Sequence, residues 1–329
     1  MNAPASHLVL TDALVEIGQW LARTGYRFTT VTPATHARVI ARAPGQLARN
    51  ARDVFGWSLP FAADLLPARL LPRMERAGLL APLDGGLLRS RVRFSSLGAN
   101  LYAHSAYPTA DADAVFFGPD TSRFADLVAS ELARRPLDRR GARILDMGCG
   151  GGPGGMVAAL ASRDIQPCLV LADINPRALQ FAAANAALAG LDGVAFAQGD
   201  LFGAVDGEFD LVVSNPPYLN DAAERTYRHG GGEFGEGLSE RIVRDGLPRL
   251  APGGRLVLYT GAAIVAGRDP LLEALRVTLD LRGWPWRYRE IDPDVFGEEL
   301  DEPAYRRAER IAAVALVVER PAEPASSVA

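Results

Sequence analysis

The sequence predicts an α/β protein whose main part is a doubly wound, mostly parallel sheet, preceded by a smaller helical segment. From about Val115 onward, short apolar runs alternate with helical patterns, which is the order of β-α-β units. The apolar runs lack strict alternation of apolar and polar residues, and this favours parallel strands covered on both faces. A glycine-rich run, residues 148–155, directly follows the first of these strands. Such a run lets the backbone pass close to a ligand.

Seven strands are expected in this part of the chain, at residues 142–147, 167–173, 194–198, 209–214, 254–260, 286–291 and 311–319. Helices are expected at residues 122–135, 154–163, 176–188, 238–250 and 270–282. Ser122 and Asn175 are suited to cap two of these helices, and Pro176 is suited to a first helical position. The last two strands are expected to give the sheet an antiparallel ending, joined by the acidic residues 292–302.

The first 108 residues have a different pattern. Helices are expected at residues 12–23, 33–42 and 65–77, followed by a turn at 84–86 and a strand at 87–94. Arg89, Arg91 and Arg93 alternate along this strand, so we expect them to share one face. Helices followed by a hairpin with a basic rim are typical of a winged-helix module. A solvated edge strand, protected by charge against pairing, is the alternative interpretation.

Charge is distributed unevenly along the chain. The net charge is −4, yet residues 1–108 contain 12 Arg and only 6 Asp plus Glu. A basic first segment favours an acidic partner such as nucleic acid, although a mildly basic soluble surface explains it equally well.

Bulk composition excludes several classes of protein. With 48% hydrophobic and 22% charged residues the chain is globular. No apolar run approaches the roughly 18 residues of a membrane span, and no signal peptide is evident. The two cysteines, Cys149 and Cys168, are too few for a disulfide framework or a zinc site. We therefore expect a cytoplasmic protein without a metal.

The tetrapeptide Asn215-Pro216-Pro217-Tyr218 follows the expected strand at 209–214. Two successive prolines remove two backbone donors and fix two φ angles, and Pro216 pushes Asn215 into an extended conformation. The result is a rigid turn that offers carbonyl and amide oxygens beside an aromatic ring. This surface suits a planar group that carries an –NH2; an ordinary proline-rich turn is the alternative.

Acidic residues close three successive strands. Asp146 stands at the head of the glycine-rich run, and Asp173 follows it 27 residues later at the end of the next strand. An acid in that position hydrogen-bonds a ribose diol in dinucleotide folds. Asp200 ends the third strand.

With these motifs in this order, residues from about 115 to 320 resemble a class I S-adenosylmethionine (SAM) dependent methyltransferase. They resemble more closely the HemK-like N-methyltransferases, because Pro119-Asp120-Thr121 matches an element before the glycine loop. Gly231-Gly232 and Gly237-Leu238 match another element after the tetrapeptide. The resemblance implies a seven-stranded, Rossmann-like methyltransferase sheet, and it does not cover residues 1–108.

The resemblance also implies roles for individual residues. Asp146, Gly148 and Gly150 lie against the methionine end of SAM. Asp173 binds the ribose, and Asp200 with Leu201 flanks the adenine. The remaining implied site residues are Thr121 and Ile174 for the cofactor, Asn215 for both cofactor and catalysis, and Pro216, Pro217 and Tyr218 for catalysis.

The chain is therefore expected to transfer a methyl group from SAM to a planar amide or amino nitrogen of a macromolecule. The glutamine N5 of a protein is slightly favoured over the N6 of adenine in RNA or DNA. A small-molecule acceptor and an NAD-dependent oxidoreductase are further alternatives. The glycine-rich loop 227–235 is expected to cover the acceptor, with Arg228 and His229 as possible contacts.

The expected domains are a substrate-recognition domain at 1–108, the methyltransferase domain at 109–320 and a disordered tail at 321–329. Oligomeric state is not predicted.

Overall fold

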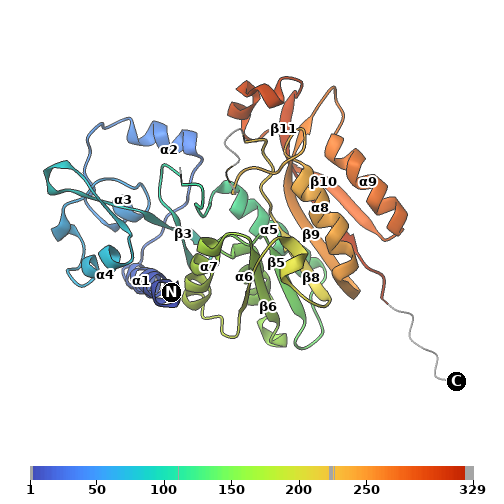
Figure 1. Ribbon diagram of the computed structural model, residues 1–329, viewed down its shortest axis with the longest axis horizontal. Coiled ribbons are helices and arrows are strands. Elements are labelled where there is room, and N and C mark those ends of the chain that lie inside the picture. Colours follow the sequence, from blue (N-terminus) through green and yellow to red (C-terminus); the bar gives the residue numbers. More distant parts are fainter. Residues whose placement is uncertain (1–2, 110, 222–224, 226, 323–329) are drawn as a thin grey trace.

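The computed structural model describes residues 3–109, 111–221, 225 and 227–322 of the chain. Its largest unit is a seven-stranded sheet in the order β10-β11-β9-β8-β5-β6-β7 (Figure 1). The strands are β5 (Arg143–Met147), β6 (Cys168–Asp173), β7 (Ala195–Gln198), β8 (Phe209–Ser214), β9 (Leu250–Ile264), β10 (Trp286–Asp292) and β11 (Arg310–Glu319). Each of the seven strands expected from the sequence is present, although β9 is longer than predicted.

Strand directions confirm the predicted fold class. β5 pairs in parallel with β6 and β8, while β7 and β9 extend the parallel arrangement on either side. Only β11 runs against its neighbours, since it pairs antiparallel with both β9 and β10. The strand order reverses at β5, where the neighbours are the second and fourth strands in chain order. In open α/β sheets, ligands bind outside the carboxyl ends of the strands at such a switch point.

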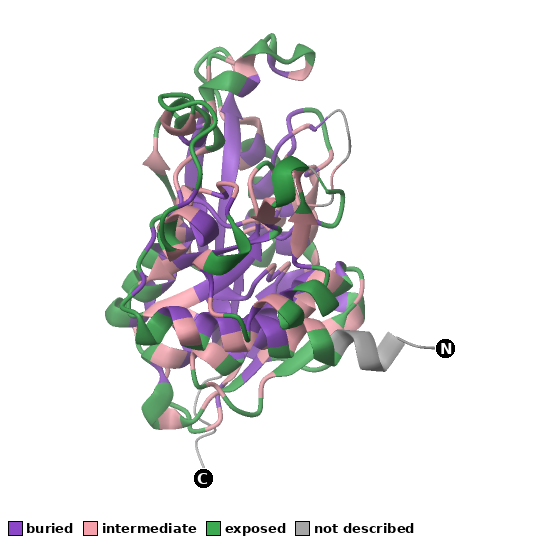
Figure 2. Ribbon diagram, turned by 90° about the vertical axis from the view of Figure 1, so that its left-hand side faces the viewer, coloured by how far each residue is buried: buried purple, intermediate pink, exposed green. Residues whose placement is uncertain are grey.

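Both faces of the sheet are covered by helices. Successive residues of one strand enter different cores: Ile144 packs with α5, α6 and α7, and Leu145 packs with α8 and α9. The five helices are α5 (Pro119–Arg134), α6 (Pro153–Ala161), α7 (Pro176–Leu188), α8 (Gly237–Gly246) and α9 (Pro270–Arg282). This explains why the strands are apolar on both sides. Figure 2 shows the sheet as the buried interior.

Helix boundaries agree best with the prediction where a cap is present. Asn175 accepts a hydrogen bond from the Arg177 N–H at 2.9 Å, and α7 begins at Pro176 as predicted. The prediction of Ser122 as a cap is wrong, because α5 begins three residues earlier, after Gly118. The helix expected to reach 250 ends at Gly246 and is followed by a 3-10 turn, Leu247–Arg249, that contains a proline.

In its described part, from residue 3 onward, the N-terminal segment contains four helices and two short hairpins. They are α1 (Ala3–Arg23), α2 (Pro33–Ile40), α3 (Ala51–Phe55), α4 (Leu71–Arg76), β1 (Leu80–Pro82), β2 (Leu88–Ser90), β3 (Val92–Leu97) and β4 (Asn100–Ser105). The single helix predicted at 65–77 is wrong. A 3-10 turn ends at Leu65, Leu66 is extended with ψ 153°, and α4 starts only at Leu71. Pro67 explains the break, because the residue before a proline avoids the helical region.

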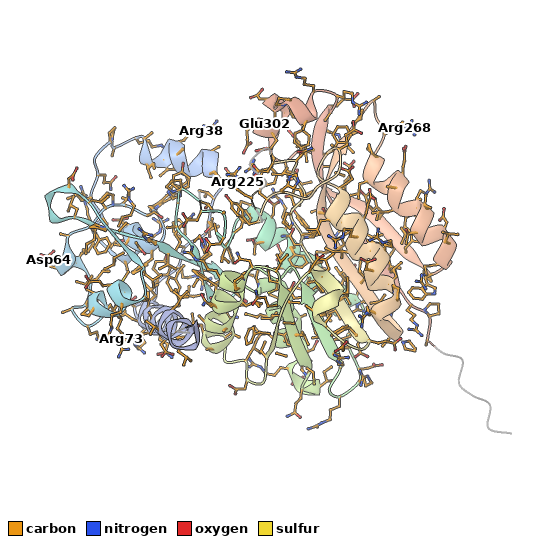
Figure 3. All side chains as sticks on the ribbon, viewed as in Figure 1. Arg38, Asp64, Arg73, Arg225, Arg268 and Glu302 are labelled. Carbon is orange, nitrogen blue, oxygen red and sulfur yellow. The ribbon has the colours of Figure 1, made fainter. Side chains whose placement is uncertain are left out.

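The predicted basic face of three arginines is also wrong. The chain bends at Arg91 between β2 and β3, so the alternation does not continue. Arg91 is exposed, whereas Arg93 is only 4% exposed. Other charged side chains of this segment do point to solvent, among them Arg38 and Asp64 at its outer edge (Figure 3).

The N-terminal segment packs on α7 of the sheet. α1 lies beside α7 (Figure 1), and a Cβ on Gly18 would stand 2.5 Å from Cδ1 of Leu188. Phe181 of α7 belongs to the same buried cluster as the N-terminal apolar residues. The Asn185 side chain accepts from the Ala103 N–H at 2.7 Å and donates to the Gly151 carbonyl at 2.9 Å. It therefore links β4 directly to the glycine loop.

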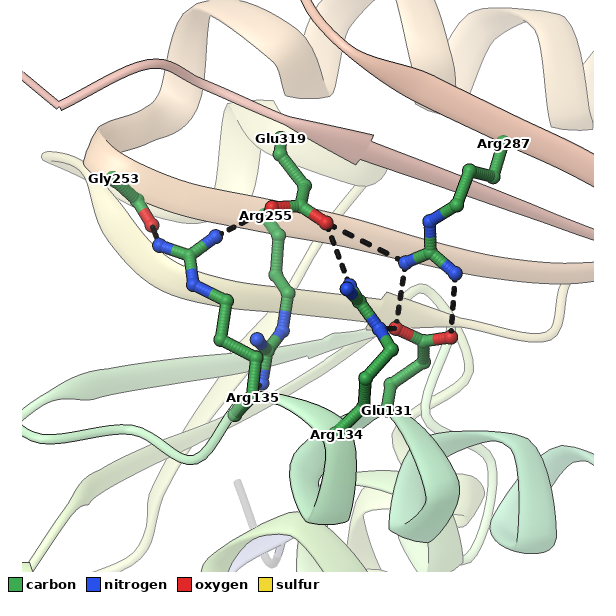
Figure 4. A network of polar contacts seen from close by, with 7 residues as sticks. All are labelled: Glu131, Arg134, Arg135, Gly253, Arg255, Arg287 and Glu319. Carbon is green, nitrogen blue, oxygen red and sulfur yellow. Dashed lines mark hydrogen bonds and ion pairs between the residues drawn. The ribbon is translucent and has the colours of Figure 1, made fainter.

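Charged contacts join α5 to the antiparallel end of the sheet (Figure 4). Glu131 on α5 pairs with Arg287 of β10 at 2.9 Å. Glu319 at the end of β11 pairs with Arg134 at 2.6 Å and with Arg135 at 2.7 Å. These pairs bridge three elements that are distant in sequence.

Within the described residues, no helix is long and apolar enough to cross a membrane. Residues 323–329 of the predicted disordered tail lie outside the described part of the chain.

Candidate active site

A cavity of about 360 Å³ opens at the carboxyl ends of β5, β6 and β8. Its wall contains every cofactor and catalytic residue predicted from the sequence. These are Thr121, Asp146, Gly148, Gly150, Asp173, Ile174, Asp200, Leu201, Asn215, Pro216, Pro217 and Tyr218. A cavity of this size is suited to a small molecule or cofactor.

The glycine loop leaves open space beside its backbone. Gly148 and Gly150 have φ angles of 67° and 53°, a region in which other residues are strained. A Cβ added to either glycine would meet no atom within 4 Å. The loop therefore exposes bare backbone to the cavity, as the close approach of a cofactor requires.

Asp173 connects the glycine loop to the end of β6. Its two carboxylate oxygens accept hydrogen bonds from the N–H groups of Gly150 and Asn175, each at 2.8 Å. Burial raises the pKa of Asp173, which shows that these backbone donors only partly offset desolvation. Ile174 beside it is 53% exposed and lines the cavity. An exposed apolar side chain in a cavity wall is suited to contact an aromatic ring.

Asp146 is the most deeply buried acid of the site. It is 1% exposed, and its Oδ2 accepts a hydrogen bond from the Gly155 N–H at 2.7 Å. Burial raises its pKa from 3.8 to about 7. In the native protein Asp146 therefore keeps its proton at pH values where the unfolded chain has lost it.

We expect Asp146→Asn to change the pH dependence of stability. Because the native state holds the extra proton between about pH 4 and 7, the unfolding free energy falls as pH rises through this window. The variant removes this contribution, which amounts to at most about 4 kcal/mol. The contribution is measured as the difference between the unfolding free energies of the ligand-free protein in urea at pH 4.5 and at pH 8. The exposed Asp164→Asn is the matched control, and equal pH slopes for Asp146→Asn and wild type would contradict the assignment.

The tetrapeptide lies at the end of β8. The Ser214 hydroxyl donates to the Met147 carbonyl at 2.7 Å and joins the ends of β8 and β5. Asn215 is half-buried and Pro216 is buried. The Tyr218 ring is packed against Gly261, whose added Cβ would stand 2.3 Å from its Cδ2. The Tyr218 and Phe296 rings also form a T-shaped contact, with 5.9 Å between the ring centroids.

Asp200 differs from the other two acids in being largely exposed. Its Oδ2 accepts from Nη2 of Arg241 at 2.8 Å, and both residues line the cavity. Leu201 beside it has a φ of 48°. Because the Asp200 carboxylate is paired with Arg241, a ligand in the cavity meets the electrostatic field of the ion pair and not that of an isolated negative charge.

The loop after the tetrapeptide contributes Tyr227, Arg228 and His229 to the cavity wall. Arg228 forms an ion pair with Glu299, and the Tyr227 hydroxyl donates to the Thr109 carbonyl at 2.9 Å. His229 accepts from the Asp221 N–H at 3.2 Å. These contacts hold the loop beside the site.

Several lining residues are absent from the sequence prediction. Asp120 is 3% exposed and accepts from the Tyr259 hydroxyl at 2.6 Å and from Arg123 at 3.2 Å. Phe116 and Phe296 also line the cavity. Of these three residues, only Asp120 could have been found from the sequence, because it belongs to the tripeptide 119–121 that resembles a HemK-like element. The Thr121 hydroxyl of that element accepts from the Gly118 N–H at 3.1 Å and thereby caps α5.

The sheet order, the glycine loop after β5 and the acids at the strand ends define a class I SAM-dependent methyltransferase domain. Residues 115–266 match the model of the methyltransferase small domain family. SAM is the cofactor of the class, and the open backbone at Gly148 and Gly150 fits it.

Similar proteins include a release factor glutamine methyltransferase of Deinococcus radiodurans, 34% identical over 58% of this chain and 66% of the relative. A ribosomal RNA small subunit methyltransferase C of Chromohalobacter salexigens is 38% identical over 38% of this chain and 33% of the relative. The chain thus spans less than two thirds of the curated relatives it matches. A solved structure of P. horikoshii TYW2 in complex with MeSAdo aligns with a TM-score of 0.47 and 14% identity, covering 88% of this chain and 98% of that one.

Proposed function

We propose that this protein is a SAM-dependent N-methyltransferase that acts on a planar amide or amino nitrogen of a macromolecule, with a protein glutamine amide as the favoured acceptor. The observation that carries the proposal is the position of Asn215 in the same cavity as the glycine loop and Asp173. Similarity to a release factor glutamine methyltransferase supports the favoured acceptor.

In the proposed reaction the tetrapeptide orients a weak nucleophile. The lone pair of an amide or aromatic amine nitrogen is delocalised, so attack requires a fixed geometry. The Asn215 side-chain oxygen and the Pro216 carbonyl each accept one N–H, which turns the lone pair toward the donor. They also stabilise the positive charge that develops on nitrogen. When bound, SAM supplies an electrophilic methyl group. Gly148, Gly150, Asp173 and Ile174 are the residues proposed to hold it.

A nucleobase amine is the second candidate acceptor. Its support is the similarity to ribosomal RNA small subunit methyltransferases. Adenine N6 presents the same planar –NH2 to Asn215. The predicted basic hairpin gives this candidate less support than the sequence implied, because Arg93 is buried.

The test is incorporation of radiolabelled methyl groups from SAM into a lysate of cells that lack this protein. Protease-sensitive label that strong acid releases as methylamine is the expected result, because acid hydrolysis of N5-methylglutamine yields that amine. Nuclease-sensitive label would redirect the proposal to nucleic acid. Absence of label in every macromolecular fraction would overturn it.

We expect Gly261→Ala to reduce turnover about 100-fold, because displacement of a positioning group by about 1 Å has an effect of this size. The new methyl group would overlap the Tyr218 ring and displace it. Affinity for SAM should be unchanged in equilibrium dialysis. Gly203→Ala is the control, since its added Cβ meets no atom within 4 Å. Wild-type turnover in Gly261→Ala would show that the Tyr218 position is unimportant.

A further inference from the structure

A second cavity, of about 170 Å³, lies between the N-terminal segment, the start of α5 and the connection between β10 and β11. We call it the junction pocket; it is lined by residues 30–33, His36, Arg93, Tyr107, Thr109, residues 116, 117, 119, 120 and 123, and residues 294–296 and 298. Phe116, Asp120 and Phe296 line both cavities. The junction pocket therefore directly adjoins the cavity that contains Asn215.

Arg93 is a buried cation with few partners. It is 4% exposed, and among the described residues no carboxylate forms an ion pair with it. One Nη lies 3.4 Å from the Thr30 hydroxyl, and the guanidinium carbon lies 5.5 Å from the centre of the Phe28 ring. Its Nε has no hydrogen-bond partner in the described part of the chain. Burial lowers the pKa of Arg93 to about 10, so the group is still charged at neutral pH.

His36 is the second group of the pocket with an unused polar atom. It is fully buried, its Nε2 lies 3.0 Å from the Trp57 carbonyl, and its ring stacks on Tyr107 with 4.0 Å between centroids. Its Nδ1 has no partner among the described residues. Burial and the charge of Arg93 lower the pKa of His36 to about 4, so the ring is neutral at pH 7.

A buried guanidinium without a counter-ion is costly to the fold and is normally paired. Its planar set of donors matches a carboxylate or phosphate in a bidentate arrangement. An anion that entered the pocket would find in Arg93 a cation without a carboxylate partner among the described residues.

Charges at the mouth distinguish between these two anions. Asp294 and Glu298 line the pocket and are exposed. Arg123 already pairs with Asp120 at 3.2 Å and with Asp292 at 2.8 Å. A nucleic acid carries a negative phosphate at every nucleotide, and these phosphates would be repelled by Asp294 and Glu298. A polypeptide can place a single negative side chain in the pocket and so avoids most of this repulsion.

We propose that the junction pocket binds an acidic side chain of a polypeptide acceptor, next to the residue that is methylated, and that Arg93 is its partner. This inference rests on the proposed function. It makes Arg93 a specificity-determining residue that does not contact the cofactor.

The test compares Arg93→Met with wild type in thermal unfolding, SAM binding and label transfer. Met keeps most of the side-chain volume and removes the unpaired charge. We expect Tm to rise by about 3 °C and SAM affinity to stay within twofold. Label transfer into the protein fraction at low acceptor concentration should fall at least tenfold. Arg91→Met, at an exposed neighbouring position, should leave all three values at wild-type levels.

A second arm examines the anion itself. Lysate protein treated with carbodiimide and methylamine has neutral side chains in place of carboxylates, and wild type should label it at least tenfold less than untreated protein. Arg93→Lys keeps the charge without the planar fork and should show an intermediate loss.

Absence of label with wild type refutes the proposed function rather than this inference. If wild type labels protein and Arg93→Met labels it equally, or if the variant fails to fold, the inference is wrong. Nuclease-sensitive label that falls in Arg93→Met would assign the pocket to phosphate and also overturn it.

Discussion

Asn215→Ala is expected to lower the rate of methyl transfer by about 1000-fold, the effect of removing a preorganised polar group that acts on the developing charge. The amide oxygen lost in this variant is one of the two acceptors proposed to orient the nitrogen. Pro216 and Pro217 keep the turn rigid, so the backbone is expected to stay in place. Single-turnover transfer of labelled methyl groups measures the rate, and calorimetry measures SAM affinity, which should change less than twofold.

Asn215→Asp provides the comparison. It is isosteric and retains an acceptor oxygen, so its rate should lie between those of wild type and Asn215→Ala. A rate for Asn215→Ala within threefold of wild type would refute a catalytic role for the tetrapeptide. A large loss of SAM affinity in the same variant would instead make Asn215 a residue of the cofactor site.

Asp173→Ala is expected to weaken SAM binding about 100-fold, roughly 2.7 kcal/mol, which is the range for loss of charged hydrogen bonds. The carboxylate is proposed to accept hydrogen bonds from the ribose. In addition, it accepts from the N–H groups of Gly150 and Asn175. The variant therefore removes a ligand contact and also releases the glycine loop. Calorimetric titration with SAM measures the affinity.

Asp164→Ala is the control for this experiment, since Asp164 is an exposed acid of the same domain outside the cavity wall. Asp173→Asn separates the two effects, because its side-chain oxygen can still accept one backbone hydrogen bond. Wild-type affinity in Asp173→Ala would show that the acid serves the fold alone.

The sheet and its helices were largely predictable because local signals agree with tertiary structure there. Asn175-Pro176 and Asp269-Pro270 each combine a side-chain cap with a proline in the first turn, and α7 and α9 begin where predicted. Prediction failed where tertiary contacts decide. Nothing in the alternation of residues 89–93 indicates that the chain bends at Arg91 and turns Arg93 inward.

The cavity wall shows the same division. Residues that follow strands, such as Asp173 and Asn215, were predictable because parallel strands end at one edge of the sheet. Phe296 lies in the acidic connection and lines the cavity. Tyr259 lies inside β9 and donates a hydrogen bond to the lining residue Asp120, and both take these positions only through packing. No local pattern marks them.

The contact between Asn185 and Ala103 has a consequence for the modularity of the chain. The Asn185 amide exchanges two hydrogen bonds with the Ala103 backbone and contacts Gly151 with the same nitrogen. Gly18 also leaves room for Leu188 at this seam. A different N-terminal segment, joined to this methyltransferase domain by recombination, must therefore provide two features. It needs a backbone partner for Asn185 and a small residue opposite Leu188. Hybrids that meet both requirements should evolve more readily than those chosen by length alone.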